Sequence, residues 1–174
     1  MTPRIVAAGF LLGLILAGAA LARIDTAASS NVVPPGTLVD SIAASTLAGE
    51  PSSFAPSADS RWIVVYVNEQ CGHCHAQLEA WQTTHAAAPA ALADLSMFVV
   101  SESTYTGPAQ STLPADFPHT RLLDDDRRIA SAFGITRVPT TIVLEGPRVR
   151  AAFEGVQPPS AVLREYEERA GRRP

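Results

Sequence analysis

The chain contains 174 residues, of which 47% are hydrophobic, and carries 13 basic and 17 acidic side chains for a formal net charge of −4. This length suits one domain with a sizeable core and a short appendage. Every basic residue is Arg and no basic cluster stands free of acidic neighbours, so the charge pattern gives no indication of nucleic-acid binding. The two cysteines are too few for a disulfide scaffold.

The N-terminal segment between Arg4 and Arg23 carries no charge. As a helix, residues 5–22 would cover roughly 27 Å, close to the hydrocarbon thickness of about 30 Å in a bilayer. The segment predicts either a single membrane-spanning anchor or a signal peptide cleaved after Ala22, where Ala-Leu-Ala matches the small-residue cleavage rule. Its length favours the anchor. Both alternatives place the rest of the chain outside the cytoplasm, on the periplasmic side of a cytoplasmic membrane.

The composition divides the chain into three regions. Residues 1–22 form the anchor or signal peptide, and residues 23–36 form a polar linker that ends in Pro-Pro-Gly. Residues 37–174 form the folded domain.

The domain is predicted to begin with two short strands over residues 46–54, around a Gly-Glu-Pro turn. Residues 61–68 (Arg-Trp-Ile-Val-Val-Tyr-Val-Asn) form a continuous apolar run of strand length. Continuous apolarity is typical of a central strand that is covered on both faces.

A helix is expected to follow from about Gly72 to near Pro89. Its inward face is given by four residues at helical spacing, Cys74, Leu78, Trp81 and His85. Residues 95–101 then predict a second buried strand, which completes a β-α-β unit. Residues 102–120 contain three prolines and are expected to form a loop.

The last part of the chain predicts a helix, two strands and a helix. Residues 124–134 form the first helix, with Asp124 as N-cap and Gly134 as its stop. Residues 140–145 and 149–154 form two strands around a Gly-Pro turn. The final helix starts near Ser160, and its inward residues are Val162, Leu163, Tyr166 and Ala170.

The cysteines form a Cys-Gly-His-Cys motif at the start of the first predicted helix. A helix N-terminus stabilises a thiolate through its free N–H groups and partial positive charge. Cys71 is therefore the expected nucleophile, and Cys74, one turn inside the helix, is the expected resolving thiol. His73 lies between them, where a partly protonated imidazole would favour the reduced form and so modulate the centre.

The same residues also match Cys-x-x-Cys-His, the attachment motif of haem c, with His75 as the axial ligand. The distal ligand would then be Met97, but this residue lies in an apolar strand pattern that indicates the core. A zinc site would need His73 and His75 beside the two cysteines, and residues within one helical turn point in divergent directions. We therefore predict a redox dithiol, with no cofactor and no metal.

Two segments resemble the thioredoxin superfamily, and within it the membrane-tethered TlpA-like thiol-disulfide oxidoreductases of bacteria. The first segment is 64–74 (Val-Val-Tyr-Val-Asn-Glu-Gln-Cys-Gly-His-Cys), and the second is 133–144, which contains Val-Pro-Thr. The order of elements between residues 46 and 170 also agrees. The resemblance implies an α/β thioredoxin-like fold, in which helices flank a central mixed sheet, with an added N-terminal β-hairpin.

The resemblance also implies that Pro139 is cis and lies against the cysteine pair. The backbone of Val138 would then be exposed to pair with an extended substrate strand. The implied substrates are protein thiols and disulfides, and a partner redox protein would donate or accept the electrons. The chain departs from thioredoxin at Val65, where a buried acid is expected; Glu69 and Glu102 are possible substitutes.

Two other functions remain open on the sequence alone. One is a c-type haem electron carrier. The other is a redox-inactive thioredoxin-like module that binds a partner through Val138 and Pro139.

Overall fold

The computed structural model describes residues 32–68, 70–92, 96–102, 117 and 119–167. The predicted anchor or signal peptide and most of the predicted linker lie outside these residues. Among the described residues, no helix combines the length and apolar character needed to cross a bilayer. The segment from Val32 packs along the domain: Val32 and Val39 are buried, and the Val33 N–H donates to the Phe133 carbonyl at 3.0 Å.

Seven strands of the described chain form one mixed sheet, in the order β2-β1-β5-β4-β3-β6-β7. The parallel neighbours are β3 with β4 and β4 with β5, whereas the remaining pairs are antiparallel. The elements are β1 (Ile42–Ser45), β2 (Pro51–Phe54), β3 (Arg61–Val67), α2 (Gly72–Ala87), η1 (Pro89–Leu92), β4 (Ser96–Ser101), β5 (His119–Leu123), α3 (Arg128–Phe133), β6 (Thr140–Glu145), β7 (Arg148–Glu154) and α4 (Pro159–Glu167).

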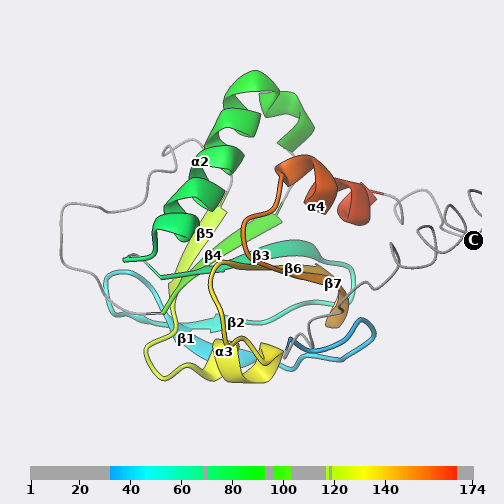
Figure 1. Ribbon diagram of the computed structural model, residues 1–174. Helices are drawn as coiled ribbons and strands as arrows, with labels where there is room; N and C mark the ends of the chain where they lie inside the picture. The colour runs from blue at the N-terminus through cyan, green and yellow to red at the C-terminus, as the bar shows by residue number, and fades with distance from the viewer. Residues whose placement is uncertain (1–31, 69, 93–95, 103–116, 118, 168–174) are drawn as a thin grey trace, which may run out of the picture. The chain divides into compact units, whose positions relative to one another are not determined.

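Strand β3 is an interior strand, between β4 and β6, and both of its faces are apolar. Its residues from Ile63 to Val67 are all buried, and alternate side chains enter the two cores on opposite sides of the sheet. Helices α2 and α4 cover one face and α3 covers the other (Figure 1). The sheet and its helices therefore form the α/β architecture that the sequence predicts.

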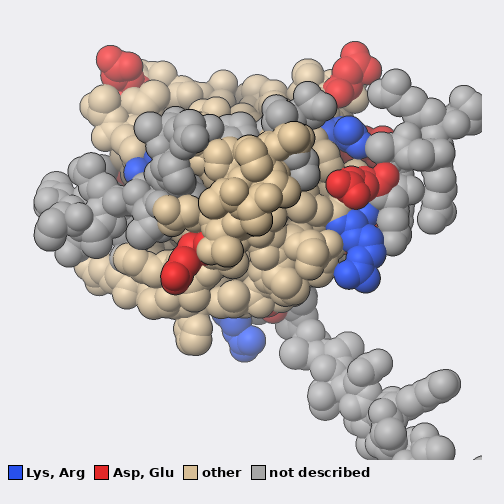
Figure 2. Space-filling model, turned by 90° about the horizontal axis from the view of Figure 1, so that it is seen from above, with Lys and Arg blue, Asp and Glu red and all other residues tan. Residues whose placement is uncertain are grey.

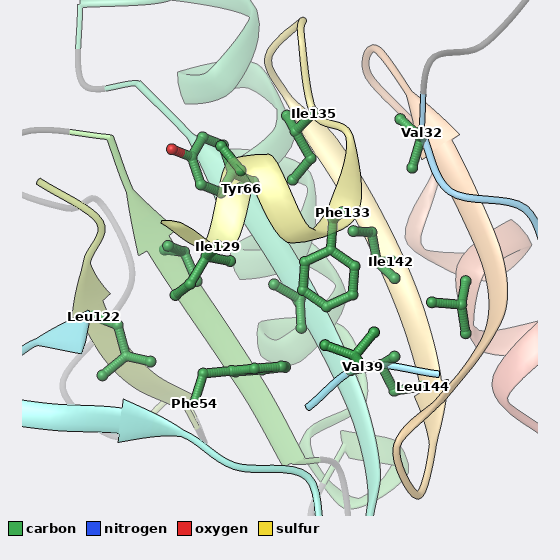
Figure 3. Close-up of a cluster of buried hydrophobic side chains, with 14 residues drawn as sticks. Val32, Val39, Phe54, Tyr66, Leu122, Ile129, Phe133, Ile135, Ile142 and Leu144 are labelled. Atoms are coloured by element: carbon green, nitrogen blue, oxygen red, sulfur yellow. The ribbon is translucent and has the colours of Figure 1, made fainter. Parts of the chain in front are cut away.

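Each face of the sheet has its own hydrophobic core. On the α2 side, Ile63, Val65 and Val67 pack with Leu78 and Trp81. The core on the α3 side is drawn in Figure 3, which shows the Phe133 side chain extending from α3 toward the sheet. The labelled members of this core are Val32, Val39, Phe54, Tyr66, Leu122, Ile129, Phe133, Ile135, Ile142 and Leu144.

The added hairpin is present, but it begins earlier than predicted. Its first strand is β1, which precedes residue 46, and the turn runs from Thr46 to Glu50, closed by a 2.8 Å hydrogen bond from the Thr46 N–H to the Glu50 carbonyl. Pro51 begins β2 rather than lying in the turn, which agrees with the tolerance for Pro at the first position of a strand.

Two further predictions were wrong at one end of the predicted segment. The end of the predicted loop 102–120 belongs to β5, a strand whose first three residues are polar or charged, so that only Leu122 and Leu123 are fully buried. The predicted helix 124–134 is shorter, because Arg127 adopts a left-handed conformation and α3 starts at Arg128. Gly134 does end this helix, with φ of 63°.

Candidate active site

Cys71 lies at the junction between β3 and α2, where it is the N-cap of the helix. Its Sγ accepts a hydrogen bond from the Cys74 N–H at 3.3 Å. The first turn of α2, which is described in full, contains no acidic side chain that would oppose the effect of the positive end of the helix dipole on the sulfur. Cys71 is half-buried, so part of its side chain is accessible to solvent.

Cys74 lies one turn further along α2, and its environment is different. Its side chain is 1% exposed and packs in the core beneath the helix. Burial raises the pKa of the Cys74 thiol to about 12, although a hydrogen bond from the Asn68 N–H to Sγ, at 3.4 Å, opposes this shift. Both cysteines are free thiols, and Cys71 is the more accessible of the two.

The loop before β6 brings Val138 and Pro139 to the cysteines. The Val138–Pro139 peptide bond is cis, as the sequence predicts. The Cys71 Sγ lies 3.9 Å from the Val138 carbonyl oxygen, within the range of a hydrogen bond donated by a thiol. The Pro139 carbonyl accepts a 2.8 Å hydrogen bond from the Gly155 N–H, which fixes the loop to the end of β7. Residues far apart in the sequence therefore meet at one site.

The remaining sequence candidates lie around this centre or outside it. His73 is exposed on the first turn of α2. Met97 is 2% exposed and packs in the core on the α2 side, where the apolar pattern placed it. Glu69 falls outside the described residues. Within the described ranges, no group of three or more His, Cys, Asp or Glu side chains could hold a metal ion.

Of the two candidate acids, Glu102 lies within the described residues and is connected to the site. Its carboxylate accepts a 2.9 Å hydrogen bond from the Asn68 side-chain amide, and it forms an ion pair with Arg127. Val65, at the position where thioredoxin has an acid, is fully buried and apolar. Sequence reasoning missed Asn68, because a polar residue directly after a strand is common and carries no signal of its own.

Sequence reasoning also missed Gln77, which is fully buried on α2. Its side chain bonds both backbone groups of Gln157: Nε2 donates to the carbonyl at 3.0 Å, and Oε1 accepts from the N–H at 2.6 Å. The available signal was its spacing, since Gln77 lies three residues after Cys74 and four before Trp81, both on the inward face. This contact ties α2 to the loop after β7.

Viewed from above Figure 1, the described surface is mostly uncharged, and its charged side chains lie mainly near the margins (Figure 2).

Neither a family model nor a curated protein matches the chain. Its fold does match solved structures. One is the thiol:disulfide interchange protein DsbE from Chlorobium tepidum, with a TM-score of 0.62 and 17% identity over 78% of this chain and 97% of that one. StoA from Bacillus subtilis matches with a TM-score of 0.53 and 15% identity, over 75% of this chain and 98% of that one. The exposed lipoprotein thioredoxin from Streptococcus pneumoniae matches with a TM-score of 0.55 and 15% identity, over 74% of this chain and 98% of that one. The described domain thus has the thioredoxin-like α/β fold.

Proposed function

We propose that the protein is a thiol-disulfide oxidoreductase of the TlpA-like kind, with Cys71 and Cys74 as its redox centre. The observation that carries this proposal is the inequality of the two thiols. Cys71 is accessible at a helix N-terminus and lies beside Val138, whereas Cys74 is buried one turn away with a raised pKa. An accessible attacking thiol and a shielded resolving thiol are the two parts that disulfide exchange requires.

The reaction proceeds in two exchanges. The Cys71 thiolate attacks one sulfur of a client disulfide, forms a mixed disulfide and releases the other client sulfur as a thiolate. Cys74 then loses its proton and attacks the Cys71 sulfur, which forms the Cys71–Cys74 disulfide and releases the second client thiolate. Two electrons pass from the enzyme to the client. The reverse sequence oxidises a client dithiol, and a partner redox protein restores the starting form.

The client is expected to be an extended protein segment that contains a cysteine. Val138 is half-buried next to Cys71, so its backbone is close enough to pair with a segment whose cysteine faces Sγ. His73, exposed between the cysteines, would modulate the thiolate by its charge.

The proposed location is the outer side of the cytoplasmic membrane, with residues 1–22 as anchor or, after cleavage near Ala22, as a removed signal peptide. The uncharged N-terminal segment supports this proposal. The likeness to an exposed lipoprotein thioredoxin agrees with it.

The test is reduction of insulin disulfides by the full-length chain in the presence of a dithiol donor. Cys71→Ser is expected to abolish the activity, because no mixed disulfide can form. Cys74→Ser is expected to stall as a mixed disulfide with the client, visible as a band that a reductant removes. A matched control is His75→Ala, which changes a neighbouring side chain and leaves both thiols in place. Equal activity in wild type and both cysteine variants would contradict the proposal, and a Soret absorption band would indicate haem instead.

A further inference from the structure

The buried sulfur of Cys74 receives a specific polar contact from the protein. Its Sγ accepts a hydrogen bond from the Asn68 N–H at 3.4 Å, and this N–H lowers the pKa of a thiol that burial raises. A thiolate that forms on buried Cys74 is largely removed from water, so an N–H that donates to its sulfur stabilises it. The position of Asn68 therefore affects how readily Cys74 can react.

The side chain of Asn68 holds that N–H in place. Its Oδ1 accepts a hydrogen bond from the Gln70 N–H at 2.9 Å, and its Nδ2 donates to the Glu102 carboxylate at 2.9 Å. Its carbonyl accepts from the Cys71 N–H at 3.0 Å. Asn68 lies just beyond the last residue of β3, where the ladder of the sheet no longer fixes the backbone. The hydrogen bonds of Asn68 fix its backbone instead.

Glu102 is itself anchored on both sides. Its N–H donates to the Val67 carbonyl at 3.1 Å, which places it at the end of β4 beside the end of β3. Its carboxylate pairs with Arg127, the residue that precedes α3. The guanidinium neutralises the carboxylate, so Glu102 can hold Asn68 without adding an unbalanced negative charge near the thiols.

We propose that Glu102 is a positioning residue for the resolving step, and that it acts by fixing Asn68 so that the Asn68 N–H faces the charge that develops on Cys74 Sγ. The inference rests on the proposed function and explains how the chain resolves mixed disulfides with Val65 in place of a buried acid. Glu102 bonds Asn68 and Arg127, not a sulfur, so its role is to orient the N–H.

The two exchange steps can be observed separately with DTNB, an aromatic disulfide whose released thiolate absorbs visible light. Reduced full-length protein is mixed with excess reagent in a stopped-flow instrument. Attack by Cys71 releases the first coloured thiolate at a rate that rises with reagent concentration. Attack by Cys74 on the new mixed disulfide releases the second at a rate independent of reagent concentration. The first phase serves as an internal control for the second.

In Glu102→Ala, the second phase is expected to slow by about threefold to tenfold, the effect of weakening one hydrogen bond, while the first phase is unchanged. Asn68→Ala keeps the backbone N–H but loses both side-chain hydrogen bonds, so the same selective slowing of the second phase is expected. This variant tests the inference if Glu102→Ala does not fold. Glu102→Gln retains an oxygen that can accept from Asn68 and is expected to restore the second phase.

The matched control is Glu145→Ala, which removes another Glu–Arg ion pair, with Arg150. In the ladder between β3 and β6, Glu145 lies opposite Arg61, which is at the other end of β3 from Asn68. Both phases should therefore stay unchanged. The inference is overturned if Glu102→Ala leaves the second phase unchanged, or if Glu102→Gln or Glu145→Ala slows it equally. Failure of the proposed function is distinguishable, because the wild-type chain would then lack the concentration-independent phase.

Discussion

Among single residues, Asp124 shows how one buried carboxylate can join a strand, a helix and a core tyrosine. It is 2% exposed and accepts hydrogen bonds from the Tyr66 hydroxyl at 3.0 Å, the Ile129 N–H at 2.9 Å and the Ala130 N–H at 2.8 Å. It therefore caps α3 from four residues before the first helical residue. Burial, and then the Asp124 carboxylate, raises the pKa of Tyr66 well above its usual range.

Replacement of Asp124 should consequently be costly. Asp124→Ala leaves two helix N–H groups and a buried hydroxyl without their acceptor, and we expect the free energy of unfolding to fall by about 3 kcal/mol. Urea denaturation followed by circular dichroism measures the change. Asp125→Ala is the matched control: its side chain is exposed, so the expected change is within about 0.5 kcal/mol. Similar losses in the two variants would show that the Asp124 contacts contribute little.

Between elements, the contact of Gln77 with Gln157 joins α2 to the loop between β7 and α4. A side-chain amide that pairs with both backbone groups of another residue imitates one step of a β-ladder. The same loop is held at its other end by the bond from the Gly155 N–H to the Pro139 carbonyl. The helix that carries the cysteines and the loop that carries Pro139 are thus connected through residues 155–157.

Gln77→Leu should loosen this connection while preserving the apolar packing of α2. Both backbone groups of Gln157 lose their partner, so we expect the free energy of unfolding to fall by about 1–3 kcal/mol. The Gln157 amide should also exchange its hydrogen faster, as measured by hydrogen–deuterium exchange. Gln82→Leu provides the control, because Gln82 is a half-buried glutamine on the same helix. Unchanged exchange at Gln157 in the Gln77 variant would rule out the clamp.

The elements that the sequence predicts well are those in which pattern and chemistry agree. Strand β3 is an uninterrupted apolar run, and α2 follows a cysteine that can cap it. Strand β5 escaped prediction because its neighbours in the sheet, β4 and β1, supply the pairing that its polar first half does not indicate. Helix α3 starts later than predicted because Asp124 accepts from N–H groups five and six residues further along the chain, more than the usual separation of two or three residues for an N-cap.

At the scale of the whole molecule, the site forms where the ends of β3 and β4 meet the loop before β6. The motif residues Cys71, Cys74 and Pro139 could be predicted because each is chemically distinctive and has a characteristic place in the thioredoxin pattern. Asn68 could not be predicted, and Glu102 was only one of two candidate acids. The hydrogen bond between them depends on which strand ends are adjacent in the sheet. Sheet order is a long-range property that single-strand patterns do not encode.

The burial of Cys74 should also make the stability of the reduced protein depend on pH in the alkaline range. Burial raises the pKa of the thiol from its ordinary value of 9.0 to about 12. As pH rises through this window, the unfolded chain gives up the Cys74 proton while the folded chain retains it, so the free energy of unfolding falls. At pH values below this window, Cys74 is protonated in both the folded and the unfolded chain, so it does not make the free energy of unfolding depend on pH.

We therefore expect the free energy of unfolding of the reduced wild-type chain to decline more steeply with pH than that of Cys74→Ser, by up to about 1.4 kcal/mol per pH unit. The measurement is urea denaturation under a reducing agent at several pH values from about 8 to about 10.5, a range that spans the unfolded-state ionisation. Tyr66 is present in both chains, so its contribution is common to the two pH profiles. Parallel pH profiles would mean that Cys74 ionises equally easily in the folded and unfolded chains, and that burial does not distinguish the Cys74 thiol from that of Cys71.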